Sequence, residues 1–280
     1  VIDLGCGTGR DAFLLSAEVG PRGWVTGVDF TEEQLAVAQR HQAYHRDQFG
    51  LPQINTEFLL GPIDDLGSID IPAKHYDVAV SNCAINLAED KAAVFAEIRR
   101  VLKPGGELLF SDVFASRRVP GHLRADPTLL GECLAGAMYL EDFRRIMAST
   151  GWLDFRVVAS APIRIEDASL REQLGPLEFT STTVRAFRLD LEDRCEDYGQ
   201  VATYLGTMPH QPIGYRLDDH HYFERGKPTL VCGNTAAMLT ETRLASYFRV
   251  DGDRETHFGL FPCGDGGVNS GSATANAGCC

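Results

Sequence analysis

Short apolar runs alternate with amphipathic stretches through the first 160 residues. The apolar runs predict strands at residues 1–4, 24–29, 57–60, 76–81 and 107–113. The stretches between them predict helices at 11–20, 31–44 and 90–102, the second with Thr31 as its N-cap and Gln34 at the capping-box position. Strands that alternate with helices form parallel βαβ units. The pattern therefore predicts an α/β fold with a doubly wound, Rossmann-like sheet.

The pattern changes after about residue 162. A helix at 140–150 and a strand at 153–159 precede the change. Segments rich in β-forming residues follow it, at 179–189, 201–205, 215–217, 221–224 and 229–232. We therefore expect a first domain over 1–160 and a second, smaller, β-rich α+β domain over 161–262. Residues 263–280 are mostly Gly, Ser, Ala, Asn and Thr between cysteines, and this composition predicts a flexible tail.

The first predicted strand leads into a loop with a glycine at every second position, Gly5, Gly7 and Gly9. Glycine tolerates positive φ and lets the main chain pass close to a ligand. The dinucleotide fingerprint spaces its glycines differently, and Asp3 would repel a pyrophosphate but suits an amino group. A glycine-rich turn without a ligand is the simpler alternative. The whole stretch 1–10 resembles motif I of class I S-adenosylmethionine (SAM) methyltransferases, which implies SAM as the cofactor.

Polar residues that end the next strands extend this predicted site. Asp29 closes the second strand, where a carboxylate can accept both ribose hydroxyls. Ile63 and Asp64 follow the third strand, where class I methyltransferases place an apolar residue and an acid around adenine. The alternative for both acids is a solvated strand end or loop. The predicted SAM-binding residues are Asp3, Gly5, Cys6, Gly7, Gly9, Arg10, Asp29, Phe30, Ile63, Asp64 and Asn82.

Charge and hydropathy exclude some partners. The net charge of −13 argues against nucleic acid and against an anionic membrane surface. No apolar run approaches the length of a membrane span, and no signal peptide is visible. The chain starts without Met inside a predicted strand, so we expect the natural N-terminus to be missing. A chain of 280 residues does not need disulfide staples, so its eight cysteines predict reduced thiols and a cytoplasmic location.

Five segments together carry a narrower resemblance. They are 3–11 (DLGCGTGRD), 80–87 (VSNCAINL), 106–113 (GELLFSDV), 131–137 (GECLAGA) and 194–195 (RC). In order and spacing they resemble the arsenite methyltransferases, a family that methylates trivalent arsenic with SAM. The resemblance implies that Cys133 and Cys195 bind arsenic and are the catalytic residues. It also implies a further cysteine upstream of motif I, before Val1, and a thiol reductant such as thioredoxin or glutathione.

The chemistry of arsenic agrees with this implication. As(III) is soft, and thiolates are the soft ligands that proteins offer. Cys133 follows the fifth predicted strand and Cys195 belongs to the second predicted domain, so a shared site would lie at the domain interface. The arsenic lone pair could then attack the sulfonium methyl in line to give methylated arsenicals. No proton has to leave arsenic, so positioning alone would suffice.

The remaining candidates have simpler interpretations. We expect Cys6, Cys83 and Cys232 to be small buried hydrophobes. Adjacent residues of a strand point to opposite faces, so His220 and His221 are interpreted as hairpin residues and not as metal ligands. The roles of Cys263, Cys279 and Cys280 stay open.

Two other functions remain. One is a class I methyltransferase that acts on a carbon or oxygen of a small metabolite, which would need a deprotonating residue. The other is a non-catalytic protein that sequesters thiophilic metalloids.

Overall fold

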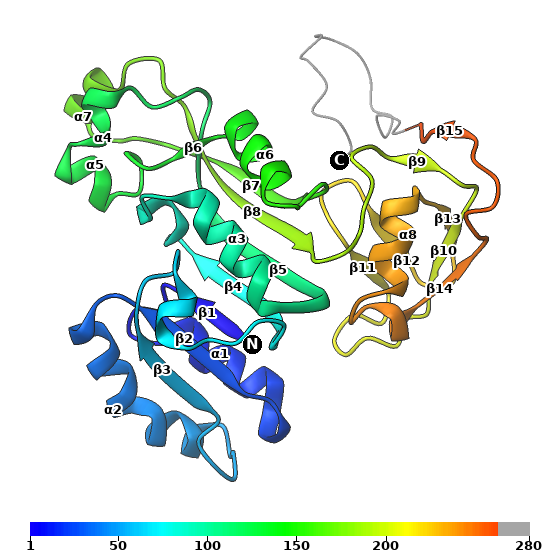
Figure 1. Ribbon diagram of the computed structural model, residues 1–280, viewed down its shortest axis with the longest axis horizontal. Coiled ribbons are helices and arrows are strands. Elements are labelled where there is room, and N and C mark those ends of the chain that lie inside the picture. Colours follow the sequence, from blue (N-terminus) through cyan, green and yellow to red (C-terminus); the bar gives the residue numbers. More distant parts are fainter. Residues whose placement is uncertain (263–280) are drawn as a thin grey trace.

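The computed structural model describes residues 1–262, and the predicted tail at 263–280 lies outside the described residues. An eight-stranded mixed sheet dominates it, in the order β3-β2-β1-β4-β5-β8-β7 with β6 paired to β5 (Figure 1). Its strands are β1 (Ile2–Leu4), β2 (Val25–Asp29), β3 (Thr56–Leu60), β4 (Tyr76–Asn82), β5 (Leu102–Ala115), β6 (Met138–Tyr139), β7 (Arg156–Ile163) and β8 (Phe179–Phe187). The first five strands run parallel, and β8 is antiparallel to both of its neighbours. The predicted doubly wound α/β sheet is confirmed.

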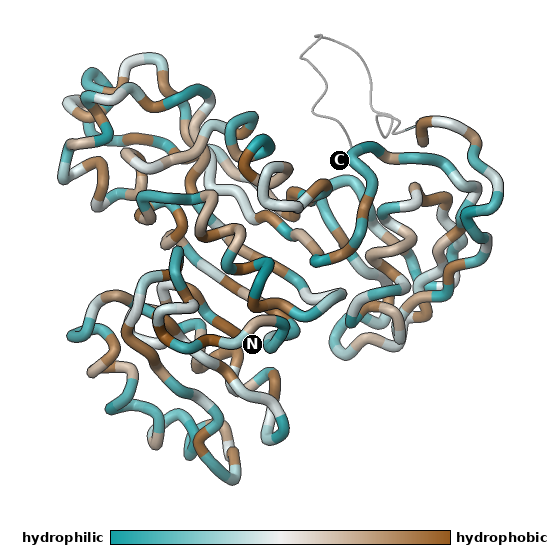
Figure 2. Tube along the Cα trace, in the orientation of Figure 1, coloured by the Kyte–Doolittle hydropathy of each residue, from teal (hydrophilic) through white to brown (hydrophobic). Residues whose placement is uncertain are grey.

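Helices cover both faces of this sheet. The longer ones are α1 (Arg10–Val19), α2 (Glu32–Gln48), α3 (Lys91–Val101) and α6 (Leu140–Ser149), and the shorter ones are α4 (Gly121–Arg124), α5 (Pro127–Gly131) and α7 (Ala168–Leu174). Helices α1 and α2 pack with Phe58 in one apolar cluster, and α3 and α6 pack with Leu59 in another. Phe58 and Leu59 are adjacent in a strand and so point to opposite faces. Figure 2 shows the outer helix α2 as mainly hydrophilic and the central strands as hydrophobic.

Single 3₁₀ turns connect several of these elements. They are η1 (Gly20–Arg22), η2 (Leu66–Ile69), η3 (Ile85–Leu87) and, further along the chain, η4 (Ala245–Tyr247). The helix predicted at 11–20 is confirmed as α1, with η1 directly behind it. Thr31 occupies the N-cap position of α2 as predicted, but its side chain makes no capping hydrogen bond.

A smaller β-rich unit follows, with its own apolar cluster around Tyr204, Phe223 and Met238. Its strands are β9 (Glu196–Asp197), β10 (Val201–Tyr204), β11 (Gly214–Arg216), β12 (Tyr222–Glu224), β13 (Pro228–Leu230), β14 (Phe248–Asp251) and β15 (Gly259–Leu260), and its helix is α8 (Gly233–Thr240). They form one three-stranded sheet and two two-stranded ribbons. His220 and His221 lie in the β11–β12 hairpin, where His221 Nδ1 lies 2.8 Å from Asp218 Oδ1.

The boundary between the two units differs from the predicted one at residue 160. Strand β8 pairs with β5 from Glu107↔Phe187 to Ala115↔Phe179, so residues 161–187 belong to the large sheet. The residues of β8 are β-formers in either sheet. Their preference for an extended conformation does not specify which neighbouring strand they pair with.

An ion pair and a side-chain hydrogen bond join the smaller unit to the sheet. The Glu107 carboxylate accepts from Arg185 Nε at 2.7 Å and from Arg243 Nε at 2.6 Å. Asp154 pairs with Arg156 at 2.7 Å and accepts from Asn234 Nδ2 at 3.1 Å. Arg243 and Asn234 belong to the smaller unit, so these contacts fix its position against the sheet. Over residues 1–262, the structure has no helix long and apolar enough to cross a membrane.

Candidate active site

The glycine loop between β1 and α1 has a backbone that other residues would strain. Gly5, Gly7 and Gly9 have φ values of 74°, 53° and 83°. A Cβ on Gly5 would lie 2.1 Å from the Cβ of Ala84. The absence of a side chain therefore lets this loop lie directly against the segment that follows β4.

Asp29 holds the loop in place. Its Oδ2 accepts a hydrogen bond from the Gly7 N–H at 2.8 Å, and its Oδ1 accepts from the Thr31 N–H at 2.9 Å. One carboxylate thus joins the glycine loop to the start of α2. It also satisfies the backbone N–H of Thr31, the N-cap residue of α2.

A cavity of about 350 Å³ opens at the carboxyl ends of β1, β2 and β4. Seven predicted SAM-binding residues line it: Gly5, Gly7, Asp29, Phe30, Ile63, Asp64 and Asn82. Gln34, Leu87 and Cys83 also line it, although the sequence pattern does not single them out for this role. We call this space the donor cavity. In open α/β sheets, ligands bind in this crevice, where the strand order reverses.

Asp3 lies in an adjoining cavity of about 300 Å³, and Asn82 lines both spaces. The Asp3 carboxylate is buried, and its Oδ2 has no hydrogen-bond partner among the described residues. Burial, and then the nearby carboxylate of Asp11, raise the pKa of Asp3 to about 7. A buried acceptor without a partner is costly, so this carboxylate suits a cationic ligand.

The other three predicted SAM-binding residues line neither cavity. The Cys6 side chain packs in the apolar cluster beneath the loop, as predicted for a small hydrophobe. Gly9 is the N-cap of α1, and a Cβ there would lie 2.8 Å from the Phe58 ring. The Arg10 side chain is exposed beside Asp11. The positions of Cys6 and Gly9 indicate a role in shaping the loop, whereas the Arg10 side chain faces solvent.

Cys133 contacts Cys83, which lines the donor cavity. Its thiol donates to the backbone oxygen of Cys83 at 3.5 Å, and the Cys83 thiol donates to Asn82 Oδ1 at 3.5 Å. Cys83 is exposed and Cys133 is half-buried. The interpretation of Cys83 as a buried hydrophobe is therefore wrong. Cys232 is buried, as predicted.

The structure does not bring Cys195 to Cys133. Cys133 follows α5, whereas Cys195 precedes β9, and these elements lie at opposite ends of the molecule (Figure 1). Cys195 is buried and is held in a disulfide. Among the described residues, no group of three or more His, Cys, Asp or Glu side chains could hold a metal ion.

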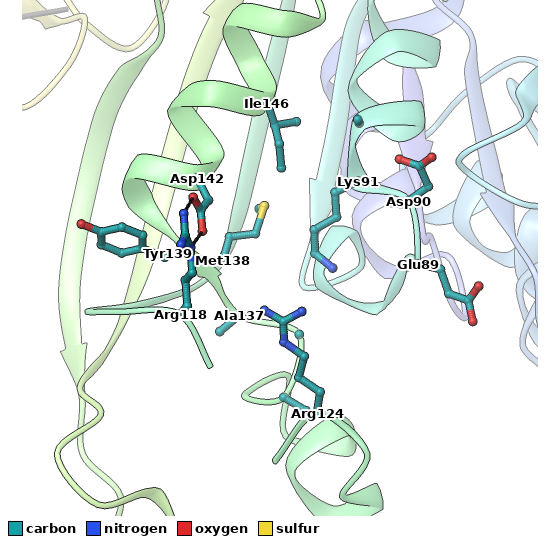
Figure 3. Close-up of a pocket in the computed structure, with 13 residues that line it drawn as sticks. Glu89, Asp90, Lys91, Arg118, Arg124, Ala137, Met138, Tyr139, Asp142 and Ile146 are labelled. Carbon is teal, nitrogen blue, oxygen red and sulfur yellow. Dashed lines mark hydrogen bonds and ion pairs between the residues drawn. The ribbon is translucent and has the colours of Figure 1, made fainter. Parts of the chain in front are cut away.

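Another cavity, of about 380 Å³, lies between α3, α6 and the segment that contains Arg118 and Arg124 (Figure 3). Arg118 pairs with Asp142, at 2.5 Å between Nε and Oδ2, while Lys91 and Arg124 extend into the same space from different elements. None of the residues that line it is a cysteine. It is therefore not where a thiophilic substrate would be bound by thiols.

The doubly wound sheet and the donor cavity beside the glycine loop define a class I methyltransferase. The model of a family described as "Methyltransferase domain" matches residues 1–151. The arsenite methyltransferase of Aquipseudomonas alcaligenes is 48% identical over 100% of this chain and 82% of its own length. That of Mus musculus is 40% identical over 89% of this chain and 65% of its own length.

A solved structure gives the same result. The arsenic (III) S-adenosylmethionine methyltransferase of Chlamydomonas reinhardtii superposes with a TM-score of 0.90 at 49% identity, over 93% of this chain and 87% of that one. The chain belongs to the arsenite methyltransferase family of SAM-dependent methyltransferases.

Proposed function

We propose that this chain transfers the methyl group of SAM to trivalent arsenic bound by the thiolate of Cys133. The observation that carries the proposal is the position of this thiol, which contacts a residue lining the donor cavity. Relatives named arsenite methyltransferases support arsenite and its methylated products as the substrates.

The donor cavity has the groups that SAM requires. Asp3 would bind the amino group, because its buried Oδ2 needs a donor. Each oxygen of Asp29 accepts one backbone N–H and retains a second lone pair for a ribose hydroxyl. Phe30 and Ile63 would contact the adenine ring, and Asp64 would accept from its amino group. When bound, SAM supplies an electrophilic methyl group on a sulfonium.

At the acceptor, the protein contributes position and a soft ligand. A thiolate of Cys133 would replace one hydroxide of arsenite and keep arsenic at the edge of the donor cavity. Arsenic uses its own lone pair as the nucleophile, so no residue has to remove a proton from it. The rate enhancement would come from holding the two reactants close together.

We retain Cys195 as a second arsenic ligand, but only after a change in the protein. Its disulfide must first be reduced, and its segment must then move toward Cys133. A thiol reductant such as glutathione or thioredoxin would donate the two electrons and itself become a disulfide. This step gives the reductant a defined role besides keeping arsenic trivalent.

The test is to incubate the chain with arsenite, SAM and a dithiol reductant and to identify the arsenic species that form. We expect methylated arsenicals from the native chain and a loss of at least about 100-fold for Cys133→Ser. Cys232→Ser is the matched control, because Cys232 is a buried thiol in the smaller unit. Binding of arsenite without any methylated product would indicate sequestration, and native activity in Cys133→Ser would contradict the proposal.

A further inference from the structure

We propose that Cys83 and Cys133 together form a dithiol site that chelates trivalent arsenicals at the edge of the donor cavity. The proposal rests on the proposed function and extends it by assigning a ligand role to Cys83. The two residues are 50 positions apart in the sequence, yet the Cys133 thiol donates a hydrogen bond to the Cys83 backbone oxygen at 3.5 Å.

The fold brings the two cysteines together through the ends of β4 and β5. The Cys83 N–H donates to Ser111 O at 2.9 Å, which fixes Cys83 directly after β4. One residue further along β5, Asp112 accepts the N–H of Asn86 at 3.0 Å and so fixes the turn η3. A Cβ on Gly136 would lie 2.0 Å from Asn86 O, so this glycine lets the segment after Cys133 lie on η3.

Both cysteines have a backbone conformation that L-residues seldom adopt. Their φ values are 56° for Cys83 and 59° for Cys133, in the left-handed region. Asp70, Lys74 and His210 are the other non-glycine residues with positive φ between residues 1 and 262. Such strain persists where the surrounding structure enforces it, and it is concentrated at functional sites. Here both strained residues are cysteines, and they lie on different loops that contact each other.

The pair is accessible and uncharged before the ligand binds. Cys83 is exposed and Cys133 is half-buried, so a small solute reaches both. Burial, and then the buried carboxylate of Asp112, raise the pKa of Cys133 to about 11 and also raise the pKa of Cys83. Two neutral thiols can lie in contact without repulsion, unlike two thiolates.

Arsenite provides its own acceptors for the thiol protons. Each S–H proton leaves with one arsenic-bound hydroxide as water, so As(OH)₃ and two thiols give (RS)₂AsOH and two waters. No electrons are transferred, and arsenic stays trivalent. The third position of arsenic remains open to hydroxide, to a small thiol or to Cys195 after its reduction.

This site holds arsenic directly against the donor cavity. Cys83 and Ala84 line that cavity together with Gly5 and Gly7, and Ala84 contacts the glycine loop. One short segment therefore forms a wall of the donor cavity and also carries an arsenic ligand. This position explains why a cysteine is useful at residue 83 although it is exposed.

The probe for the test is phenylarsine oxide, a trivalent arsenical with two exchangeable positions, which cannot be methylated while SAM is absent. The reduced full chain is treated with one equivalent without SAM and then with iodoacetamide, and mass spectrometry determines which cysteines are protected. We expect Cys83 and Cys133 to be protected together and to the same extent. Protection of Cys133 with another cysteine, while Cys83 is alkylated, would overturn the proposal.

Variants make the test quantitative. We expect Cys83→Ser and Cys133→Ser each to raise the dissociation constant for phenylarsine oxide at least about 100-fold, because a chelate becomes a single thiol ligand. Cys232→Ser should leave the constant unchanged, because Cys232 is buried in the smaller unit. Thermal melting of each variant confirms that it is folded, and the labelling of the native chain needs no variant.

The outcomes separate this inference from the proposed function. If Cys83→Ser methylates arsenite at the native rate and Cys83 is never protected, the dithiol site is wrong and the methyltransferase proposal stands. If the native chain forms no methylated arsenical but phenylarsine oxide protects the pair, the dithiol site stands and the proposed activity fails.

Discussion

The donor cavity and the Cys83–Cys133 thiol pair share a wall but are built in different ways. The donor cavity is fixed by backbone hydrogen bonds, by glycines and by the buried carboxylate of Asp29. The thiol pair lies on two loops, and its side chains are exposed at Cys83 and half-buried at Cys133. We infer that the site for the invariant reactant SAM is preorganised, whereas the site for arsenic can exchange ligands as arsenic changes during methylation.

The largest effect that would separate the two regions is expected for Asp29→Asn. The amide can replace only one of the two acceptors and would direct an N–H group at a backbone N–H. We expect the SAM dissociation constant to rise about 100-fold, or about 3 kcal/mol, with phenylarsine oxide affinity unchanged. Calorimetric titration of both ligands measures this, and a parallel loss of arsenical affinity would mean that the two regions are coupled.

The converse change is Gly136→Ala. The new methyl group would clash with Asn86 O and push the segment of Cys133 away from Cys83. We expect phenylarsine oxide to bind about 30-fold more weakly while SAM affinity stays within twofold. Gly131→Ala is the matched control, since a Cβ there meets nothing within 4 Å. Equal affinities for Gly136→Ala and the control would show that the close approach does not matter.

Smaller effects are expected for Asp3→Asn, which should make the protein more stable but weaken SAM binding. Removal of a buried charge whose Oδ2 has no hydrogen-bond partner among the described residues should raise the free energy of unfolding at pH 7 by about 1–3 kcal/mol. The same change should weaken SAM binding about tenfold, because a charged partner of the amino group is lost. Denaturant unfolding and SAM titration on the same samples test both signs. A variant that is less stable and binds SAM normally would contradict the role of Asp3.

The smallest effect is a dependence of SAM affinity on pH. The pKa of Asp3 is raised to about 7 in the free protein, and a bound cation favours the ionised form, so binding releases a proton below this pH. SAM affinity should therefore rise about eightfold from pH 6 to pH 7.5 and then level off. Asp3→Asn should flatten this profile, and an unchanged slope in that variant would assign the titration to another group.

Acidification weakens SAM binding but should increase the free energy of unfolding. Because the folded pKa of Asp3 lies above its usual value, the free energy cost of burying its charge is fully present above pH 7. This cost disappears as the pH falls toward the pKa of the unfolded chain. SAM binding and stability should thus respond to pH with opposite signs.

The sequence pattern predicts the donor side well because its signals are local. A strand, three glycines and the acid at the end of the next strand are each recognised within about ten residues, and the parallel sheet brings them together. The sequence pattern predicts the structure less well where the contacts that determine it join residues far apart in the chain. The pairing of β8 with β5 and the contact of Cys83 with Cys133 both join segments at least 50 residues apart, and hydropathy alone does not specify either.

The cysteines also show that sequence predicts local features better than distant contacts. The sequence resemblance implies that both Cys133 and Cys195 bind arsenic, but only Cys133 contacts a residue that lines the donor cavity. Cys83 belongs to a recognised motif, yet a single cysteine after a strand is indistinguishable in sequence from a small core residue. Its exposure and its strained φ are visible only in three dimensions.

The most direct test of the account is a single turnover with methyl-labelled SAM and the reduced chain already loaded with one equivalent of arsenite. We predict that the label appears on arsenic in the native chain and in Cys232→Ser, and that none appears on arsenic in Cys133→Ser although SAM is bound. Equal transfer of label to arsenic in Cys133→Ser would contradict the claim that the Cys133 thiolate holds arsenic for methylation.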